Sequence, residues 1–221
     1  MRKISFKTSS LGFLLVVIGA LTACSATSQS QPTPQPSAAA SGMGEMGGIN
    51  HSMGMDLGPA DPNFDLRFID GMIPHHQGAV VMAKQALSKA KHPELKKLAE
   101  AIIKAQDQEL AEMQQWRSQW YAQAPATPMA YDSQMGHMMP MSEAQKQSMM
   151  MSMDLGAADP EFDLRFINAM IPHHQGALVM AEDALKKSQR AEIKTLAQNI
   201  ITSQQAEIKQ MQGWKKAWYN Q

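Results

Sequence analysis

Residues 64–78 read FDLRFIDGMIPHHQG, and almost the same letters return at residues 162–176 as FDLRFINAMIPHHQG. The match extends without a gap from 53–121 to 151–219, a constant offset of 98 residues, with 41 identities in 69 aligned positions. A unit of this length is too long for one turn of a solenoid and fits a duplicated helical hairpin better. We therefore expect two copies of one unit, related by a pseudo-twofold axis.

Each copy of the unit contains two helical patterns. In the first copy, residues of the buried type recur at spacings of three and four from Asp65 to Leu87, and again from Leu95 to Trp120. Asp61-Pro62 and Asp159-Pro160 are expected to begin the first helix of each copy, with the aspartate as N-cap. Neither copy alternates with a period of two residues. The sequence therefore predicts an all-α fold, a ferritin-like four-helix bundle made of two duplicated helical hairpins.

The repeat and its flanks divide the chain into five parts. These are a lipoprotein signal peptide (1–23), a disordered tether with a methionine- and histidine-rich end (24–55), the first helical hairpin (56–121), a methionine-rich connecting loop (122–153) and the second helical hairpin (154–221). The tether is rich in Ser, Thr, Gln, Pro and Ala, a composition that cannot bury a core.

The N-terminal leader resembles that of an exported lipoprotein. Its start is basic, and the apolar run from Leu11 to Leu21 is too short to span a bilayer. The only cysteine, Cys24, follows Leu-Thr-Ala as in a bacterial lipobox, where the acylated cysteine becomes the mature N-terminus. We therefore expect an extracytoplasmic chain anchored to a membrane through Cys24, in the periplasm or at the cell surface. An ordinary signal peptide with an incidental cysteine is the alternative.

The composition excludes several classes of function. The 221 residues include 20 methionines, far above ordinary usage, and a single cysteine. One cysteine excludes an internal disulfide, a zinc finger and a cysteine-ligated iron–sulfur cluster. Lys plus Arg equals Asp plus Glu, at 20 each, and there is no basic run, so we expect no nucleic-acid partner.

A proline followed by two histidines lies inside the first helical pattern of each copy. Pro74, which removes a helical hydrogen bond, stands directly before His75-His76, and the second copy repeats this at 172–174. Met72 and Met82 lie on the same helical stripe as His75. This pattern indicates a metal site in or near the region. A helix break needed for packing and ordinary core histidines are the alternatives.

Polar residues also fall on the buried stripe of the second helical pattern. They are Gln106 and Glu109 in the first copy and Gln204 and Glu207 in the second. Because a buried carboxylate needs a partner, we expect these groups to contact the histidine rings and to hold the tautomer of a metal-binding imidazole. A structural hydrogen bond without any metal is the alternative.

Further methionines gather outside the helical patterns. The candidate metal ligands there are Met43, Met46, His51, Met53 and Met55 before the first hairpin, and Met135, His137, Met138, Met139 and Met141 in the connecting loop. Their glycine- and proline-rich surroundings predict loops, where core packing does not explain methionine. Thioethers are soft ligands that select Cu(I) and, by the same softness, Ag(I). An oxidation sink or an adaptable binding surface is the alternative.

The block Met-Ile-Pro-His-His-Gln-Gly-Ala at 72–79, followed by Met-Ala and later by Ile-Ile, Gln, Glu, Met, Trp and Trp, resembles a bacterial family of domains of unknown function. This family has a ferritin-like bundle and includes a copper-resistance protein. The resemblance covers 56–221 apart from the connecting loop, and implies an extracytoplasmic bundle that binds Cu(I) and Ag(I) and contributes to copper tolerance. The ligand positions that it implies are Met72, His75, His76, Met82, Met113, Met170, His173, His174, Met180 and Met211.

The expected function is that of a copper-binding lipoprotein that sequesters Cu(I) or transfers it. Its expected partners are copper ions, the membrane that holds the lipid anchor, and a copper exporter or another copper protein. We expect no enzyme, since no Ser/His/Asp or Cys/His arrangement can be assembled. A metal-free scaffold or partner-binding lipoprotein is the alternative. A ferritin-like metal oxidase is a further one, but that chemistry uses Glu-x-x-His motifs that this sequence lacks.

Overall fold

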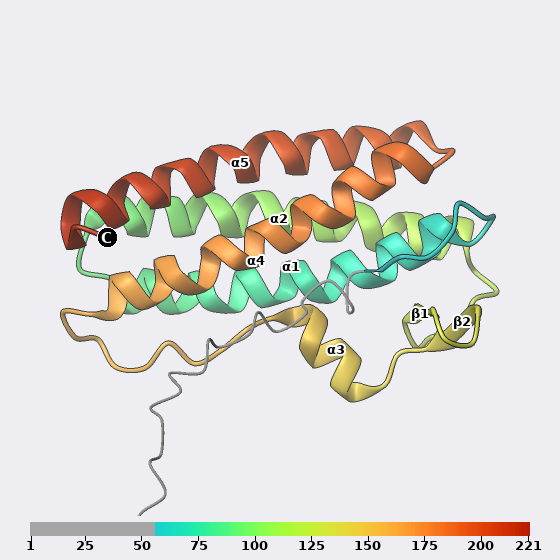
Figure 1. The fold of residues 1–221 in the computed structure, drawn as a ribbon, viewed down its shortest axis with the longest axis horizontal. Coiled ribbons are helices and arrows are strands. Elements are labelled where there is room, and N and C mark those ends of the chain that lie inside the picture. The colour runs from blue at the N-terminus through green and yellow to red at the C-terminus, as the bar shows by residue number, and fades with distance from the viewer. Residues whose placement is uncertain (1–55) are drawn as a thin grey trace, which may run out of the picture. The chain divides into compact units, whose positions relative to one another are not determined.

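The computed structural model describes residues 56–221 of the chain. Four long helices form two antiparallel hairpins, α1 (Phe64–Lys89) with α2 (Pro93–Trp120) and α4 (Phe162–Lys187) with α5 (Ala191–Tyr219). α1 also packs against α4, which joins the two hairpins (Figure 1). The all-α architecture expected from the repeat is thereby confirmed. The leader, Cys24 and the methionine- and histidine-rich end of the tether lie outside the described residues.

The first helix of each copy begins later than the sequence indicates. The N-cap positions are Asn63 and Glu161, so the prediction that Asp61 and Asp159 cap these helices is wrong. Asp61 instead accepts a hydrogen bond from the backbone N–H of Asn63, at 2.8 Å, in a turn before the helix. Its carboxylate also pairs with the guanidinium of Arg67, at 2.9 Å.

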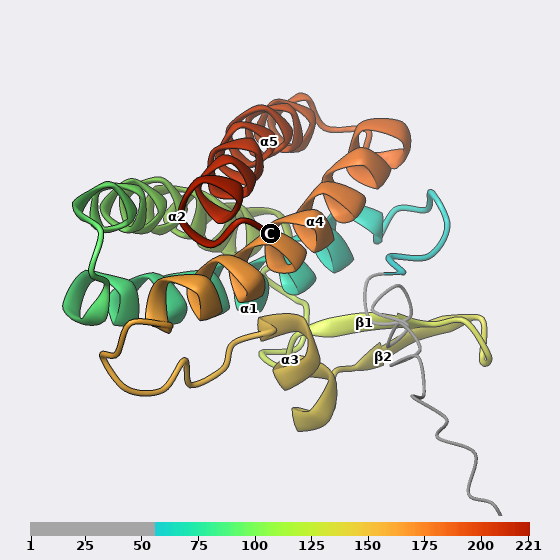
Figure 2. The same ribbon diagram turned by 60° about the vertical axis from the view of Figure 1, so that its left-hand side comes forward.

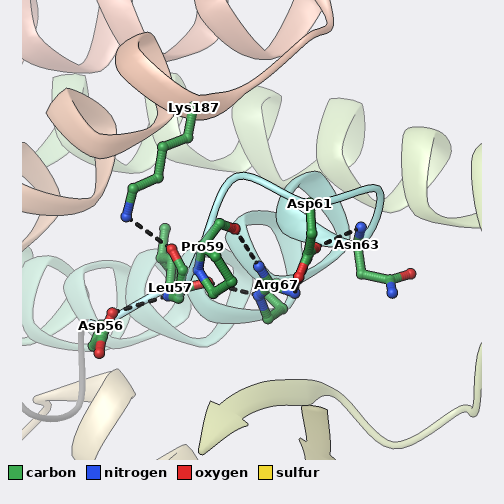
Figure 3. Close-up of polar contacts among 8 residues, drawn as sticks. Asp56, Leu57, Pro59, Asp61, Asn63, Arg67 and Lys187 are labelled. Carbon is green, nitrogen blue, oxygen red and sulfur yellow. Dashed lines mark hydrogen bonds and ion pairs between the residues drawn. The ribbon is translucent and has the colours of Figure 1, made fainter. Parts of the chain in front are cut away.

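That guanidinium fixes the chain that enters α1. Its Nε donates to the carbonyl of Leu57 at 2.6 Å, and its Nη2 donates to the carbonyl of Pro59 at 2.7 Å (Figure 3). Lys187, near the end of α4, donates to the carbonyl of Gly58 and so ties the same loop to the other copy. Arg165 and Lys89 make the corresponding bonds in the second copy. The entry to each hairpin is therefore held by the same residues twice.

The core consists of two clusters that mix the two copies. In the first cluster, Phe64, Phe68 and Met72 from the start of α1 meet Ala177, Met180 and Ala184 from the end of α4. In the second cluster, Phe162, Phe166 and Met170 from the start of α4 meet Ala79, Met82 and Ala86 from the end of α1. α1 and α4 therefore run antiparallel and cross near their middles. Each buried Phe or Met contributes roughly 1.5–3 kcal/mol to this packing.

The connection between the hairpins is more ordered than a loop. It contains β1 (Met129–Asp132) and β2 (His137–Pro140), paired antiparallel, and then α3 (Glu143–Met150). Ser142 and Gln145 form a capping box at the start of α3. β1 and α3 pack against α1 (Figure 2).

This packing corrects the expectation about the methionines of the connection. Met129, Met141 and Met149 are buried because the segment folds back onto α1, so core packing does explain them. Met135 and Met139 are exposed, at 61% and 40%. None of the described helices combines the length and the apolar character needed to cross a bilayer.

Candidate metal centre

Four buried histidines meet where α1 crosses α4. His75 and His173, each the first of its pair, face one another with ring centroids 3.9 Å apart. His76 and His174 flank them, and none of the four is more than 1% exposed. Both helices continue through their internal proline, directly before the histidines. Residues that are 98 positions apart in the chain thus become neighbours across the pseudo-twofold axis.

Each second histidine pairs with a carboxylate from the other helix of its own hairpin. Nε2 of His76 lies 2.6 Å from Oε2 of Glu109, and Nε2 of His174 lies 2.6 Å from Oε2 of Glu207. The structure thus brings together the carboxylates and histidines that the sequence suggested as partners. Gln106 and Gln204, three residues before the glutamates on the same helices, are buried without a hydrogen bond to any histidine, and the side-chain oxygen of each lacks a donor.

The unpaired buried polar atoms of the described residues concentrate at this crossing. Apart from Oδ1 of Asp65, they are Nδ1 of His75, His76, His173 and His174, Nε2 of His75, and Oε1 of Gln106 and Gln204. Because a carboxylate only accepts, Nε2 of His76 donates to Glu109, and Nδ1 of the same ring meets no hydrogen-bond partner. An unsatisfied buried polar group costs about 1–3 kcal/mol, and native proteins contain few. Several in one place indicate that a ligand belongs there.

The central pair of histidines is held in the neutral form. Burial, followed by the nearby His173, lowers the pKa of His75 well below its ordinary value. Burial, followed by the charge of His174, lowers the pKa of His173 to about 3. Both imidazoles are therefore uncharged at neutral pH, and a neutral imidazole offers a lone pair to a metal without first losing a proton.

Fully buried methionines flank the histidines on both sides. We call Met72, Met113 and Met180 the first methionine cluster, and Met82, Met170 and Met211 the second methionine cluster. Each methionine cluster contains two methionines from one copy of the repeat and one from the other. Met141 and Met149 of the connection join the first cluster. The structure therefore separates Met72 from Met82, which the helical stripe alone placed together.

The exposed candidates of the connection lie elsewhere. Met135, His137 and Met139 are exposed and Met138 is half-buried, all on the β1–β2 hairpin or its turn. Of the five candidates in the connection, only Met141 is buried, in the same core cluster as Met72, Met113 and Met180. The candidates between Met43 and Met55 lie outside the described residues.

The available donors are soft or borderline. Within residues 56–221, no three histidine or carboxylate side chains gather closely enough to hold one ion. An ion at the crossing would therefore take thioethers together with imidazole nitrogen. That donor set suits Cu(I) and Ag(I) rather than magnesium, calcium or manganese.

Two polar networks escaped the sequence analysis. Arg67 and Arg165 hold the entry loops, and the identical Asp-x₅-Arg spacing in both copies was the available signal. Asp70 accepts hydrogen bonds from Arg117 and, at 2.8 Å, from the backbone N–H of Met129, which fixes β1 on the bundle. No local sequence pattern predicts this second network, because Met129 lies 59 residues after Asp70.

Comparison with known proteins places the chain in a family. Residues 65–217 match the family described as "Domain of unknown function (DUF305)". The chain belongs to the DUF305 family. This confirms the resemblance drawn from the Met-Ile-Pro-His-His block. Among curated proteins, "Uncharacterized protein L153" of Acanthamoeba polyphaga mimivirus is 43% identical over 49 residues, 22% of this chain and 32% of that protein. The chain thus spans about a third of the length of that relative.

Solved structures share the fold. CopM in its Cu(I)-bound form is 42% identical, with a TM-score of 0.56, over 70% of this chain and 97% of CopM. CopM is also known in Cu(II)-bound, silver-bound and apo forms. A DUF305 fragment from Deinococcus radiodurans is 29% identical, with a TM-score of 0.51, over 70% of this chain and 96% of that fragment.

Proposed function

We propose that this DUF305 protein binds Cu(I), with Ag(I) as a mimic, at the buried crossing of α1 and α4. The observation that carries the proposal is the set of unpaired imidazole nitrogens between two methionine clusters. The Cu(I)-, Cu(II)- and silver-bound structures of CopM, at 41–45% identity, support it. The proposal assigns the chain a role in holding copper and no catalytic step.

The chemistry of the donors suits a soft monovalent ion. Thioethers carry no proton, and burial keeps His75 and His173 neutral, so metal binding releases no proton from them. Glu109 and Glu207 hold Nε2 of the flanking histidines and direct each free Nδ1 into the centre. Carboxylates behind metal-binding histidines serve in this way in many proteins.

We further propose that the chain is an extracytoplasmic lipoprotein, anchored through Cys24, that sequesters copper or transfers it to an exporter or another copper protein. The exposed thioethers of Met135 and Met139 offer a first contact for the ion. Met141 and Met149, farther along the same segment, are buried in the core cluster that also contains the first methionine cluster. The connection therefore carries methionines at the surface and methionines in the core cluster that contains Met72, Met113 and Met180.

The test is an anaerobic Cu(I) titration against a chromogenic chelator. One variant replaces the first methionine cluster (Met72, Met113 and Met180→Leu), and another replaces the second cluster (Met82, Met170 and Met211→Leu). Leucine keeps the volume and apolar character of methionine, so the fold is expected to persist. Each variant is expected to withdraw less copper from the chelator than the wild type, while Met129→Leu, a buried control outside both clusters, withdraws as much as the wild type. A wild-type chain that withdraws no Cu(I) from a chelator of roughly micromolar affinity contradicts the proposal.

A further inference from the structure

The C-terminal end of α3 lies at the crossing of α1 and α4. α3 packs against α1 (Figure 2), and its last residue is Met150. The backbone carbonyl of Met150 lies 3.1 Å from Nε2 of His173 on α4. The same carbonyl approaches α1 so closely that a Cβ added to Gly78 would lie 1.7 Å from its oxygen. One backbone group of the connecting segment therefore touches both of the crossing helices.

The residues on either side of Met150 hold its carbonyl in place. Met149 is buried in the core of the bundle. Met151 is the C-cap of α3 and has a left-handed backbone with a φ of 45°, which residues other than glycine rarely adopt. Such a conformation persists where the surrounding contacts impose it. The carbonyl at the end of α3 is therefore a fixed feature of the crossing.

The sequence of α1 is adapted to receive this segment. Residues 64–78 and 162–176 differ at two positions, where α1 has Asp70 and Gly71. The carboxylate of Asp70 holds β1 on the bundle. A Cβ added to Gly71 would lie 3.0 Å from Cε of Met149, so glycine leaves room for that side chain. Both differences between the repeated blocks therefore belong to the seat of the connecting segment.

The Met150 carbonyl decides which nitrogen of His173 carries the proton. Burial lowers the pKa of His173 to about 3, so the ring is neutral at neutral pH and has one proton for its two nitrogens. Because a carbonyl only accepts, Nε2 is the donor to Met150 and the lone pair is on Nδ1. Among the described residues, Nδ1 has no hydrogen-bond partner. His76 and His174 show the same division, with Nε2 donating to a glutamate and Nδ1 unpaired.

We propose that the Met150 carbonyl is a positioning group, which fixes His173 as the Nε2–H tautomer and so makes Nδ1 the atom that this ring offers to a metal. Gly78 then has a specific role, because a side chain at that position would displace the carbonyl. The connecting segment thereby sets the donor atom of a residue that lies 23 positions later in the chain.

The role toward a metal rests on the proposed copper function, whereas the hydrogen bond belongs to the metal-free chain. A hydrogen bond to the second nitrogen of a metal-binding histidine orients the ring, and its loss typically lowers metal affinity about 10–100-fold. Displacing the Met150 carbonyl is therefore expected to change two separate quantities, the tautomer of His173 without metal and the affinity for Cu(I).

Nitrogen-15 NMR of the full-length chain, labelled at its histidines, tests the tautomer in chelator-treated buffer at neutral pH. The signals of His173 are assigned from the spectrum of His173→Gln, which lacks them. In the wild type we expect the proton of this ring on Nε2 in essentially all molecules. In Gly78→Ala the new methyl group displaces the carbonyl, so both tautomers are expected. Alanine favours a helix over glycine, so α1 is expected to persist.

Two further glycine substitutions are matched controls. A Cβ at Gly71 meets nothing closer than the flexible end of Met149, at 3.0 Å, and a Cβ at Gly213 on α5 meets nothing within 4 Å. Gly71→Ala and Gly213→Ala are therefore expected to keep the wild-type tautomer of His173. In Cu(I) competition with a chromogenic chelator, Gly78→Ala is expected to lose about tenfold in affinity, while both controls stay within about twofold of the wild type.

A wild-type spectrum with the proton of His173 on Nδ1, or with a mixture of tautomers, would overturn the proposal, even where a variant fails to fold. So would an unchanged tautomer in Gly78→Ala, or a changed tautomer without any loss of copper affinity. A wild-type chain that binds no Cu(I) would overturn the copper function instead. The spectra of the metal-free chain would still decide whether Met150 fixes the ring, so the two proposals can fail separately.

Discussion

The two helical hairpins have nearly the same sequence, but their surroundings differ. Arg67 of the first copy is 1% exposed and lies 5.5 Å from the ring centroid of Tyr131, whereas Arg165 of the second copy is 36% exposed. Asp70 anchors β1 on α1, and its counterpart Asn168 faces solvent. The histidine–glutamate pairs and the buried helical methionines, by contrast, recur on both sides of the pseudo-twofold axis. Duplication therefore accounts for the histidines and methionines of the centre, and the connecting segment accounts for the asymmetry around it.

The largest expected effect separates the two arginines. Arg67→Ala removes a buried guanidinium and leaves the carbonyls of Leu57 and Pro59 without a donor, so we expect a loss of about 3 kcal/mol in the free energy of unfolding. Arg165→Ala is expected to cost about 1 kcal/mol, because solvent replaces its bonds. Chemical denaturation measures both values. Equal losses would show that the covering segment does not distinguish the two copies.

The dependence of stability on pH tests the central histidines, His75 and His173, which occupy the same position in the two copies. The pKa of His173 is about 3 in the folded state and near its ordinary 6.5 in the unfolded state, and that of His75 is lowered as well. The unfolded chain then binds more protons below pH 6.5, so the stability is fully present above that pH and falls as the pH decreases. For His173 alone we expect a loss of about 2 kcal/mol between pH 7 and pH 5 in the metal-free protein.

The control for this prediction removes the titration. In the double variant His75→Gln and His173→Gln, the unfolding free energy is expected to depend much less on pH over the same range. An unchanged slope in that variant would show that the central histidines are not the groups that titrate on unfolding.

A smaller effect is expected where the connecting segment is anchored. Asp70→Asn weakens the charged hydrogen bonds to Arg117 and to the backbone of Met129, at a cost of about 1.5 kcal/mol. Asn168→Asp, the reverse exchange on α4, is expected to stay within about 0.5 kcal/mol because that position is exposed. Thermal unfolding of the two variants provides the measurement. A larger cost for Asn168→Asp would contradict the view that only α1 carries the segment.

The duplicated sequence predicts much of the fold and the chemical character of the site. An identical pattern at a fixed offset requires two similar hairpins, and the spacing of the histidines places them on buried faces. The sequence does not show how the methionines divide. Met72 and Met82 share a stripe, but ten residues of helix separate them by about 15 Å. Because α1 and α4 cross, Met72 lies in one core cluster with Met180 of the second copy, and Met82 lies in the other with Met170.

The connecting segment illustrates a different limit. Its methionines lie among glycine and proline, and no spacing within it indicates which of them become buried. Met141 and Met149 are buried because Asp70, far earlier in the chain, holds β1 against α1. Tertiary contacts of this kind, rather than local pattern, decide that Met135 stays exposed.

X-ray absorption at the copper edge tests the central claim most directly. The protein loaded anaerobically with Cu(I) is compared with a variant in which His75, His76, His173 and His174 are replaced by leucine or phenylalanine. We expect both sulfur and nitrogen neighbours around copper in the wild type, with the nitrogen contribution lost in the variant and sulfur retained. A wild-type spectrum with sulfur alone, or one that the four substitutions leave unchanged, would contradict a copper centre at the crossing of α1 and α4.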